Sequence, residues 1–146
     1  MLARAFLKAF GKGREPWAMG STGALVSIPV FCDSGYVIMN PPRPSHGLVG
    51  PLAALALDRM SFDVAFLGAD AVDVRRGVGE PTVEETSLKE QVAGIARRTV
   101  VLADATKLEA AAPAWTLMPG PWTLVTDETT PDLEAACREA GVALLS

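Results

Sequence analysis

The sequence lacks most of the residues on which catalytic and metal sites depend. Its one histidine, His46, lies in a proline-rich segment without a matched nucleophile, so a Ser-His-Asp triad is not expected. No group of His, Cys and carboxylate residues has the spacing of a metal site, and no Gly-x-Gly-x-x-Gly pattern follows a predicted strand. We therefore expect no catalytic residue, no metal and no cofactor.

Basic runs and long apolar stretches are also missing. The chain has 13 Lys and Arg residues against 17 Asp and Glu residues, a net charge of −4, and no basic patch of the kind that binds DNA. Its apolar stretches fall short of the roughly 20 residues that a membrane span needs. Residues 1–14 spread their basic residues instead of placing them before an apolar core, as a secretory signal would. We expect a cytoplasmic protein that contacts no membrane and does not hold DNA by itself.

What the chain does contain fits one globular domain. Its 146 residues, 49% of them hydrophobic, are enough to bury a core. Cys32 and Cys137 match neither a metal spacing nor a redox pair, and we interpret them as free, buried thiols.

The chain divides into an irregular part and a regular part. Residues 1–46 are rich in turn signals, although two short apolar runs flanking Cys32–Gly35 could form a hairpin. From residue 47 onward, helix and strand patterns alternate, and the strands are apolar without polar alternation. This order predicts an α/β fold, a mostly parallel sheet with helices on both faces. The expected helices span 50–60, 83–98 and 131–141, and the expected strands span 62–68, 99–104, 122–127 and 142–146.

Polar residues end each of the three middle strands. Asp70 follows the first, Asp104 and Lys107 follow the second, and Asp127 ends the third. Because ligands of parallel sheets bind beyond the carboxyl ends of the strands, these residues predict a shared site. Carboxylates can accept bonds from ligand hydroxyls, and lysine can meet a carboxylate or phosphate. The alternative is local: Asp104 could simply cap a helical turn that holds Lys107.

The segment 71–82 is a second candidate. We expect a loop in which Gly77 leaves backbone room, leading to a helix that begins near Thr82. A helix N-terminus carries unpaired N–H groups and can hold an anion. Thr82 is equally a natural N-cap, with Glu85 three residues later as in a capping box.

The ordered series of pieces resembles a known family. The stretches GPLAALALDRMSFDVAFLGAD, GVGEPTVEETSLKEQ, VVLADATKL and WTLVTDETT are similar to the C-terminal effector-sensing domain of DeoR-family bacterial transcriptional repressors. That pattern has a Gly-Pro-led helix, a Phe-Asp-x-Ala-Phe-x-Gly strand and a Gly-containing loop. A helix carrying a lysine, an Asp-x-x-Lys strand end and a Val-Thr-Asp strand follow. Residues 47–146 are thus expected to be a DeoR-type sensor domain, preceded by an atypical segment, 1–46.

The resemblance implies a fold shared with ribose-5-phosphate isomerases and coenzyme A transferases, and a ligand that is a phosphorylated sugar or a related metabolite. It also implies a homo-oligomer that acts on DNA through a helix-turn-helix, which we find missing before Gly47. Carried over by position, the ligand-binding residues are Gly68, Asp70, Gly77, Lys89, Asp104 and Lys107, to which the helix terminus adds Thr82.

The chain departs from the family's pattern near its start. The sensing domain normally begins with a strand ending in Asp-Ser-Gly-Thr-Thr, whereas here Asp33-Ser34-Gly35 is followed by Tyr36-Val37. We interpret the N-terminal part as incomplete or altered. Two other functions stay open: an aldose–ketose phosphate isomerase on the same fold, with Asp70 and Lys107 as acid and base, and an oligomerisation module that senses nothing.

Overall fold

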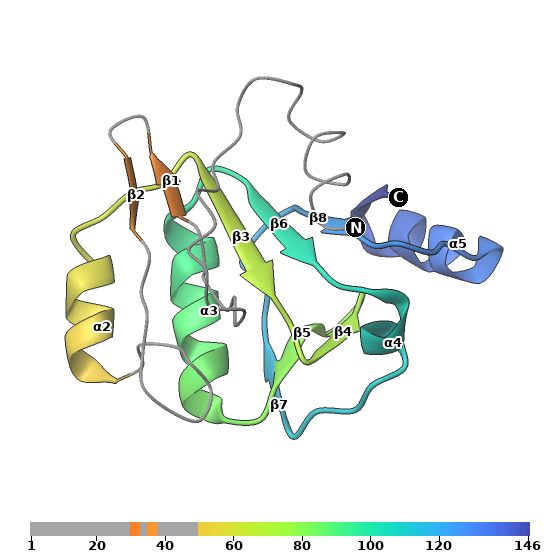
Figure 1. Ribbon diagram of the computed structural model, residues 1–146, viewed down its shortest axis with the longest axis horizontal. Coiled ribbons are helices and arrows are strands. Elements are labelled where there is room, and N and C mark those ends of the chain that lie inside the picture. The colour runs from red at the N-terminus through yellow and green to blue at the C-terminus, as the bar shows by residue number, and fades with distance from the viewer. Residues whose placement is uncertain (1–29, 33–34, 38–49) are drawn as a thin grey trace, which may run out of the picture.

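The main sheet of the protein is largely parallel. The computed structural model describes residues 30–32, 35–37 and 50–146 (Figure 1). Six strands follow the order β2-β1-β3-β6-β8-β9, of which β3, β6, β8 and β9 are parallel, whereas β1 is antiparallel to both β2 and β3. The predicted α/β class is confirmed. The strands are β1 (Val30–Cys32), β2 (Gly35–Val37), β3 (Val64–Gly68), β6 (Thr99–Leu102), β8 (Trp122–Val125) and β9 (Ala143–Leu145).

The helices begin where local signals place them, although those expected over 50–60 and 83–98 end three residues earlier than predicted. The described helices are α2 (Pro51–Leu57), α3 (Val83–Ile95), α4 (Ala105–Leu108) and α5 (Pro131–Ala140). Prolines open α2 and α5, positions where a missing N–H is tolerated. At the end of α5, Gly141 adopts a left-handed conformation with φ 71°, and its N–H donates back to the last turn.

A second, three-stranded antiparallel sheet was not predicted. It consists of β4 (Ala71–Asp73), β5 (Gly77–Glu80) and β7 (Ala114–Thr116), in the order β4-β5-β7. The expectation of a loop over 71–82 was therefore wrong, because β4 and β5 form a hairpin. Glycine contributes little to strand propensity, so the sequence Gly-Val-Gly-Glu gives a weak strand signal that tertiary pairing overrides.

Most of the core lies on one face of the main sheet. Its buried residues come from β3, β6 and β8, from the helices α2, α3 and α5, and from the hairpin. Neighbouring side chains of a strand point to opposite faces, so Leu67 belongs to this core whereas Phe66 lies in a second cluster with Val100 and Val125. Because the described members of the second cluster all come from strands, helix cover on that face stays a prediction. Figure 1 shows α2 and α3 lying side by side against the sheet.

Some expectations fall on residues that the structure does not describe. The atypical segment 1–46 lies almost wholly outside the described residues, as does His46. The exception is the hairpin around residues 32–35, which is confirmed as β1 and β2. Cys137 is free and buried, as expected, and burial raises the pKa of its thiol. Among the helices of the described part, none has the length and apolar character to cross a membrane.

Candidate functional site

The three middle strands of the main sheet deliver their polar ends to one edge. We call Gly68, Asp70, Asp104, Lys107 and Asp127 the carboxyl-end rim. Lys107 reaches from α4 to Asp70 after β3, with 3.5 Å between Nζ and Oδ1. Asp127, after β8, accepts a hydrogen bond at 2.8 Å from the backbone N–H of Ala105 at the start of α4. The ends of β3, β6 and β8 are thus linked through α4, as the strand-end prediction required.

The rim is open to solvent. Asp70 and Asp104 are exposed, and Lys107 is about one-third exposed. A side chain placed on Gly68 would meet no atom within 4 Å, so the space beside the end of β3 is unfilled. Exposed ion pairs such as Asp70–Lys107 contribute only about 0–1 kcal/mol, because water and salt screen them. Breaking this ion pair therefore costs little free energy, and each of the two side chains can bind a ligand in place of the other.

Asp104 caps the helical turn that holds Lys107, which is the alternative to ligand binding that the sequence left open. It is the N-cap of α4, and its carboxylate accepts a hydrogen bond at 3.0 Å from the N–H of Thr106. The hydroxyl of Thr106 also donates to this carboxylate and lowers the pKa of Asp104 below its ordinary value. Asp104 therefore holds in place the helical turn that carries Lys107, and any ligand hydroxyl would compete with Thr106 for the carboxylate.

Lys89 lies close to the rim but is already engaged. Its ammonium group donates a hydrogen bond to the carbonyl of Gly68 at 2.6 Å and pairs with the carboxylate of Glu80 from β5. The side chains of Lys89 and Glu80 are 12% and 7% exposed. Burial raises the pKa of Glu80, the charge of Lys89 acts in the opposite direction, and Asp70 and Glu85 nearby raise the pKa further.

Thr82 begins α3 as an N-cap. Its hydroxyl oxygen accepts a hydrogen bond at 3.3 Å from the N–H of Glu85 and lies 2.8 Å from the carboxylate of Glu85. Acidic residues already occupy the first turn, where the helix dipole favours negative charge. The position that a ligand anion would take at this helix end is therefore lined by carboxylates.

Replacing Thr82 with alanine is expected to lower the free energy of unfolding by about 1 kcal/mol, because the cap of α3 is lost. Urea denaturation of the two proteins measures the difference. Thr130→Ala provides the reference, since Thr130 caps α5 through the N–H of Leu133 at 3.2 Å. An unchanged stability for Thr82→Ala alone would contradict a capping role.

Gly77 is not brought together with the rim. It lies at the turn of the β4–β5 hairpin, paired with Asp73, whereas Gly79 and Ala71 pair at the base. Its φ is +98°, and a Cβ there would come within 2.2 Å of the carbonyl oxygen of Thr116. Gly77 is buried, and the structure gives it a packing role. Its role in ligand binding stays a prediction.

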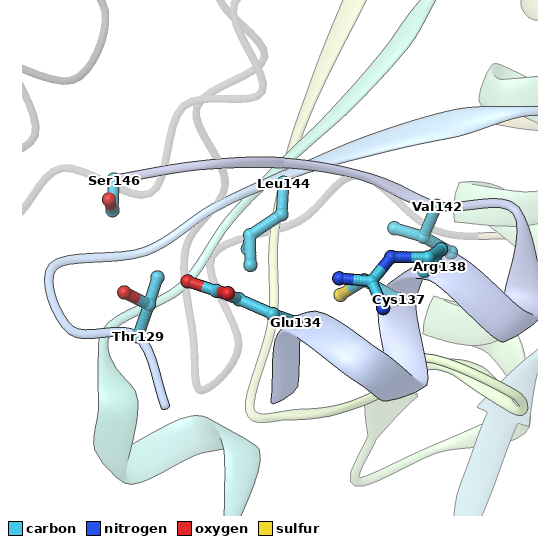
Figure 2. Close-up of a pocket in the computed structure, with 7 residues that line it drawn as sticks. All are labelled: Thr129, Glu134, Cys137, Arg138, Val142, Leu144 and Ser146. Atoms are coloured by element: carbon cyan, nitrogen blue, oxygen red, sulfur yellow. The ribbon is translucent and has the colours of Figure 1, made fainter. Parts of the chain in front are cut away.

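Two surface cavities are present, and no residue of the rim lines either of them. One, of about 370 Å³, lies between α5 and β9, and Figure 2 shows Glu134 and Arg138 of the helix beside it. The other, of about 420 Å³, is formed by the hairpin turn together with the amino ends of β8 and β9. Its arginines are engaged: Arg75 pairs with Glu139 at 2.7 Å, and Arg76 lies 4.2 Å from the centre of the Trp115 ring.

Sequence reasoning missed Glu80. No local pattern marks it, because its partner Lys89 lies on the following helix and the pairing depends on a hairpin that was not predicted. The link from Asp127 to Ala105 was also outside what spacing can show. Within the described ranges, no three His, Cys, Asp or Glu side chains are grouped closely enough to hold a metal ion.

The protein is an α/β domain whose largely parallel sheet carries an open polar rim, and comparison of the sequence gives the family. Residues 42–128 match the model of the family described as the DeoR C terminal sensor domain. This match covers more than half of the chain, and the chain belongs to that family: it is a sensor domain of the DeoR-family transcriptional regulators.

Two transcriptional regulators among the relatives agree with this assignment. The chain is 39% identical over 66 residues to the HTH-type transcriptional regulator GlpR of Haloferax volcanii, and 35% identical over 65 residues to a putative aga operon transcriptional repressor of Escherichia coli O157:H7. It is also 48% identical over 56 residues to an uncharacterized permease of Haemophilus influenzae. These matches cover 45%, 44% and 38% of this chain, in the same order. They span 26% and 24% of the two regulators and 12% of the permease.

Proposed function

We propose that the chain senses a phosphorylated sugar, or a related hydroxylated anion, at the carboxyl-end rim, and does so as part of a transcriptional regulator in the cytoplasm. Membership of the sensor family supports the regulatory role. The observation that carries the site is the exposed pair of Asp70 and Lys107, which joins two strand ends at 3.5 Å. It presents a hydroxyl acceptor and a cation side by side at the edge where parallel sheets bind ligands.

In this proposal, different residues of the rim bind different groups of the ligand. The carboxylate of Asp70 would accept hydrogen bonds from sugar hydroxyls, and Lys107 would meet the phosphate. Ligand hydroxyls would also reach Asp104, at the start of the turn that holds Lys107. Since exposed ion pairs are weak, a ligand that offers both groups a better partner can separate them. Because Lys107 is part of α4, a ligand that moves Lys107 also moves this helix. The displacement of α4 would transmit ligand binding to the rest of the domain.

Regulation requires that ligand affinity differ between two states of the protein. In this proposal the states differ in the position of α4, and the output is the grip on DNA of a helix-turn-helix, in a homo-oligomer. In the described part of the chain, α2 and α3 are separated by β3 and the β4–β5 hairpin, so they do not form a helix-turn-helix. In this proposal, the DNA contact is made by residues other than those of α2 and α3.

Binding of sugar phosphates tests the proposal. The expected result is that pentose or hexose phosphates raise the melting temperature, whereas the unphosphorylated sugars do so less. Asp70→Asn is expected to weaken binding of the unphosphorylated sugars by about tenfold or more, because a hydrogen bond to a charged group is worth about 1.5–3 kcal/mol. For the phosphates the loss is expected to be smaller, because the substitution also frees Lys107 from its partner. Lys107→Gln is expected to weaken binding of the phosphates selectively. Isothermal titration calorimetry gives the affinities.

The matched controls are Asp63→Asn and Arg97→Gln. These two residues form another exposed ion pair, at 3.6 Å, beside the amino ends of β3 and β6. The two control substitutions remove one negative and one positive charge, as Asp70→Asn and Lys107→Gln do, but at the opposite end of the strands. They are expected to leave ligand affinity unchanged. Equal effects at both ends of the sheet would contradict a site at the rim, and turnover of ribose 5-phosphate would favour an isomerase instead.

A further inference from the structure

The buried pair of Lys89 and Glu80 sets how much positive charge the rim can offer. Lys89 approaches the end of β3 closely enough to donate to the carbonyl of Gly68 at 2.6 Å. Without Glu80, its ammonium group would be the second cation of the site, after Lys107. The carboxylate of Glu80 contacts the same ammonium group from β5, so two of its three protons are already committed.

The charged groups around Glu80 show that its carboxylate pairs with Lys89 and with no other cation among them. Glu80 faces Lys89, Asp70 and Glu85, of which only Lys89 is positive. The other lysine at the rim within the described part of the chain, Lys107, has Asp70 as its own partner. Each lysine near the rim therefore has one carboxylate, but the two pairs differ in burial. The pair of Lys107 is exposed and easily exchanged, whereas that of Lys89 is buried, where a charge left without its partner is costly.

We propose that Glu80 is a specificity-determining residue: it neutralises the charge of Lys89, so that Lys107 is the one lysine among the described residues through which the rim binds an anionic group. The inference rests on the proposed function. It narrows the ligand to one whose hydroxyl groups bind the carboxylates of the rim and whose negative charge is met by a single lysine. A phosphate held at two points by two lysines does not fit this arrangement.

Inorganic sulfate is a suitable probe, because its charge stays constant across the neutral and mildly acidic range. Glu80→Gln is expected to bind sulfate about tenfold more tightly than the native protein, since an unpaired ammonium group attracts an anion strongly in a partly buried site. Titration followed by the amide signals of Gly68 and Lys89 in NMR spectra measures the affinity and locates the binding.

Two variants separate this effect from a general change in charge. Glu84→Gln makes the same substitution on the exposed first turn of α3 and is expected to leave sulfate affinity within about twofold of the native value, because exposed charges are screened. Adding Lys89→Gln to Glu80→Gln is expected to abolish the gain. The proposal is overturned if Glu80→Gln binds no better than Glu84→Gln, or if the double variant keeps the gain.

A pH profile of the native protein provides a readout that needs no variant. As the pH falls, protonation of Glu80 releases Lys89, so sulfate affinity is expected to begin to rise at a pH above the ordinary glutamate pKa of 4.5. The raised pKa of Glu80 places the change there. A flat profile, or one that persists in Glu80→Gln, contradicts the proposal. Failure of sugar phosphates to bind, with the sulfate results as expected, would instead reject the proposed function and leave the role of Glu80 intact.

Discussion

The Gly77→Ala variant is expected to be less stable than the native protein by about 3 kcal/mol, because two penalties add at this position. A φ of +98° is unfavourable for any residue with a Cβ. The added Cβ would also come within 2.2 Å of the carbonyl oxygen of Thr116, a backbone atom of the adjacent strand β7. Relief requires β5 and β7 to separate. Urea denaturation followed by circular dichroism measures the loss.

Gly94→Ala is the matched control for this result. Gly94 lies on the exposed side of α3, where the nearest atom to an added Cβ, in Pro119, is 3.9 Å away. Alanine is favoured over glycine in helices, so this variant is expected to gain about 0.5–1 kcal/mol. Equal stability of the two variants would show that the hairpin does not require its tight turn.

The Lys89→Met variant is expected to lose about 3 kcal/mol of stability at neutral pH, because it leaves the carboxylate of Glu80 buried without a partner. The loss should depend on pH. The pKa of Glu80 is already raised above its ordinary value of 4.5, so its contribution to stability is present below pH 4.5 and is lost as the pH rises through the pKa of the folded state. Removing Lys89 takes away the influence that lowers this pKa, which extends the loss to higher pH.

The double variant Glu80→Gln with Lys89→Met tests the cause. A neutral amide replaces the carboxylate, so most of the stability lost in Lys89→Met is expected to return, and the pH dependence to flatten. Denaturant midpoints between pH 4.5 and 8 for the native, single and double variants form the cycle. A single variant as stable at pH 8 as at pH 4.5 would mean that the carboxylate of Glu80 is hydrated and not buried.

The main sheet was predictable because its signals are local. Apolar runs mark the parallel strands, and helix caps such as Thr82 and Gly141 mark where helices start and stop. The second sheet was not predictable in this way. Its strands have three or four residues, and β7 pairs with β5 across more than thirty residues of intervening sequence. Such strands form because tertiary contacts stabilise them, and the hydrophobic pattern of the sequence does not predict them.

The candidate site shows the same division. Position at strand ends placed Asp70, Lys107 and Asp127 at one edge, and the structure brings them there. Spacing could not tell that Asp104 has a partner in Thr106, or that Lys89 has one in Glu80. Sequence patterns indicate which groups reach a region. The charges those groups retain depend on pairings made across the fold.

The attachment of α4 has a mechanical consequence. This single turn of helix is held by Lys107 to the segment after β3 and by Asp127 to the segment after β8, and both attachments are exposed to solvent. None of its residues is fully buried, and Leu108 packs against the core from the surface, so a shift of α4 would move this contact while the sheet beneath it stays intact. A displacement that begins at the end of β3 would then be transmitted through α4 to the end of β8, two strands away in the sheet.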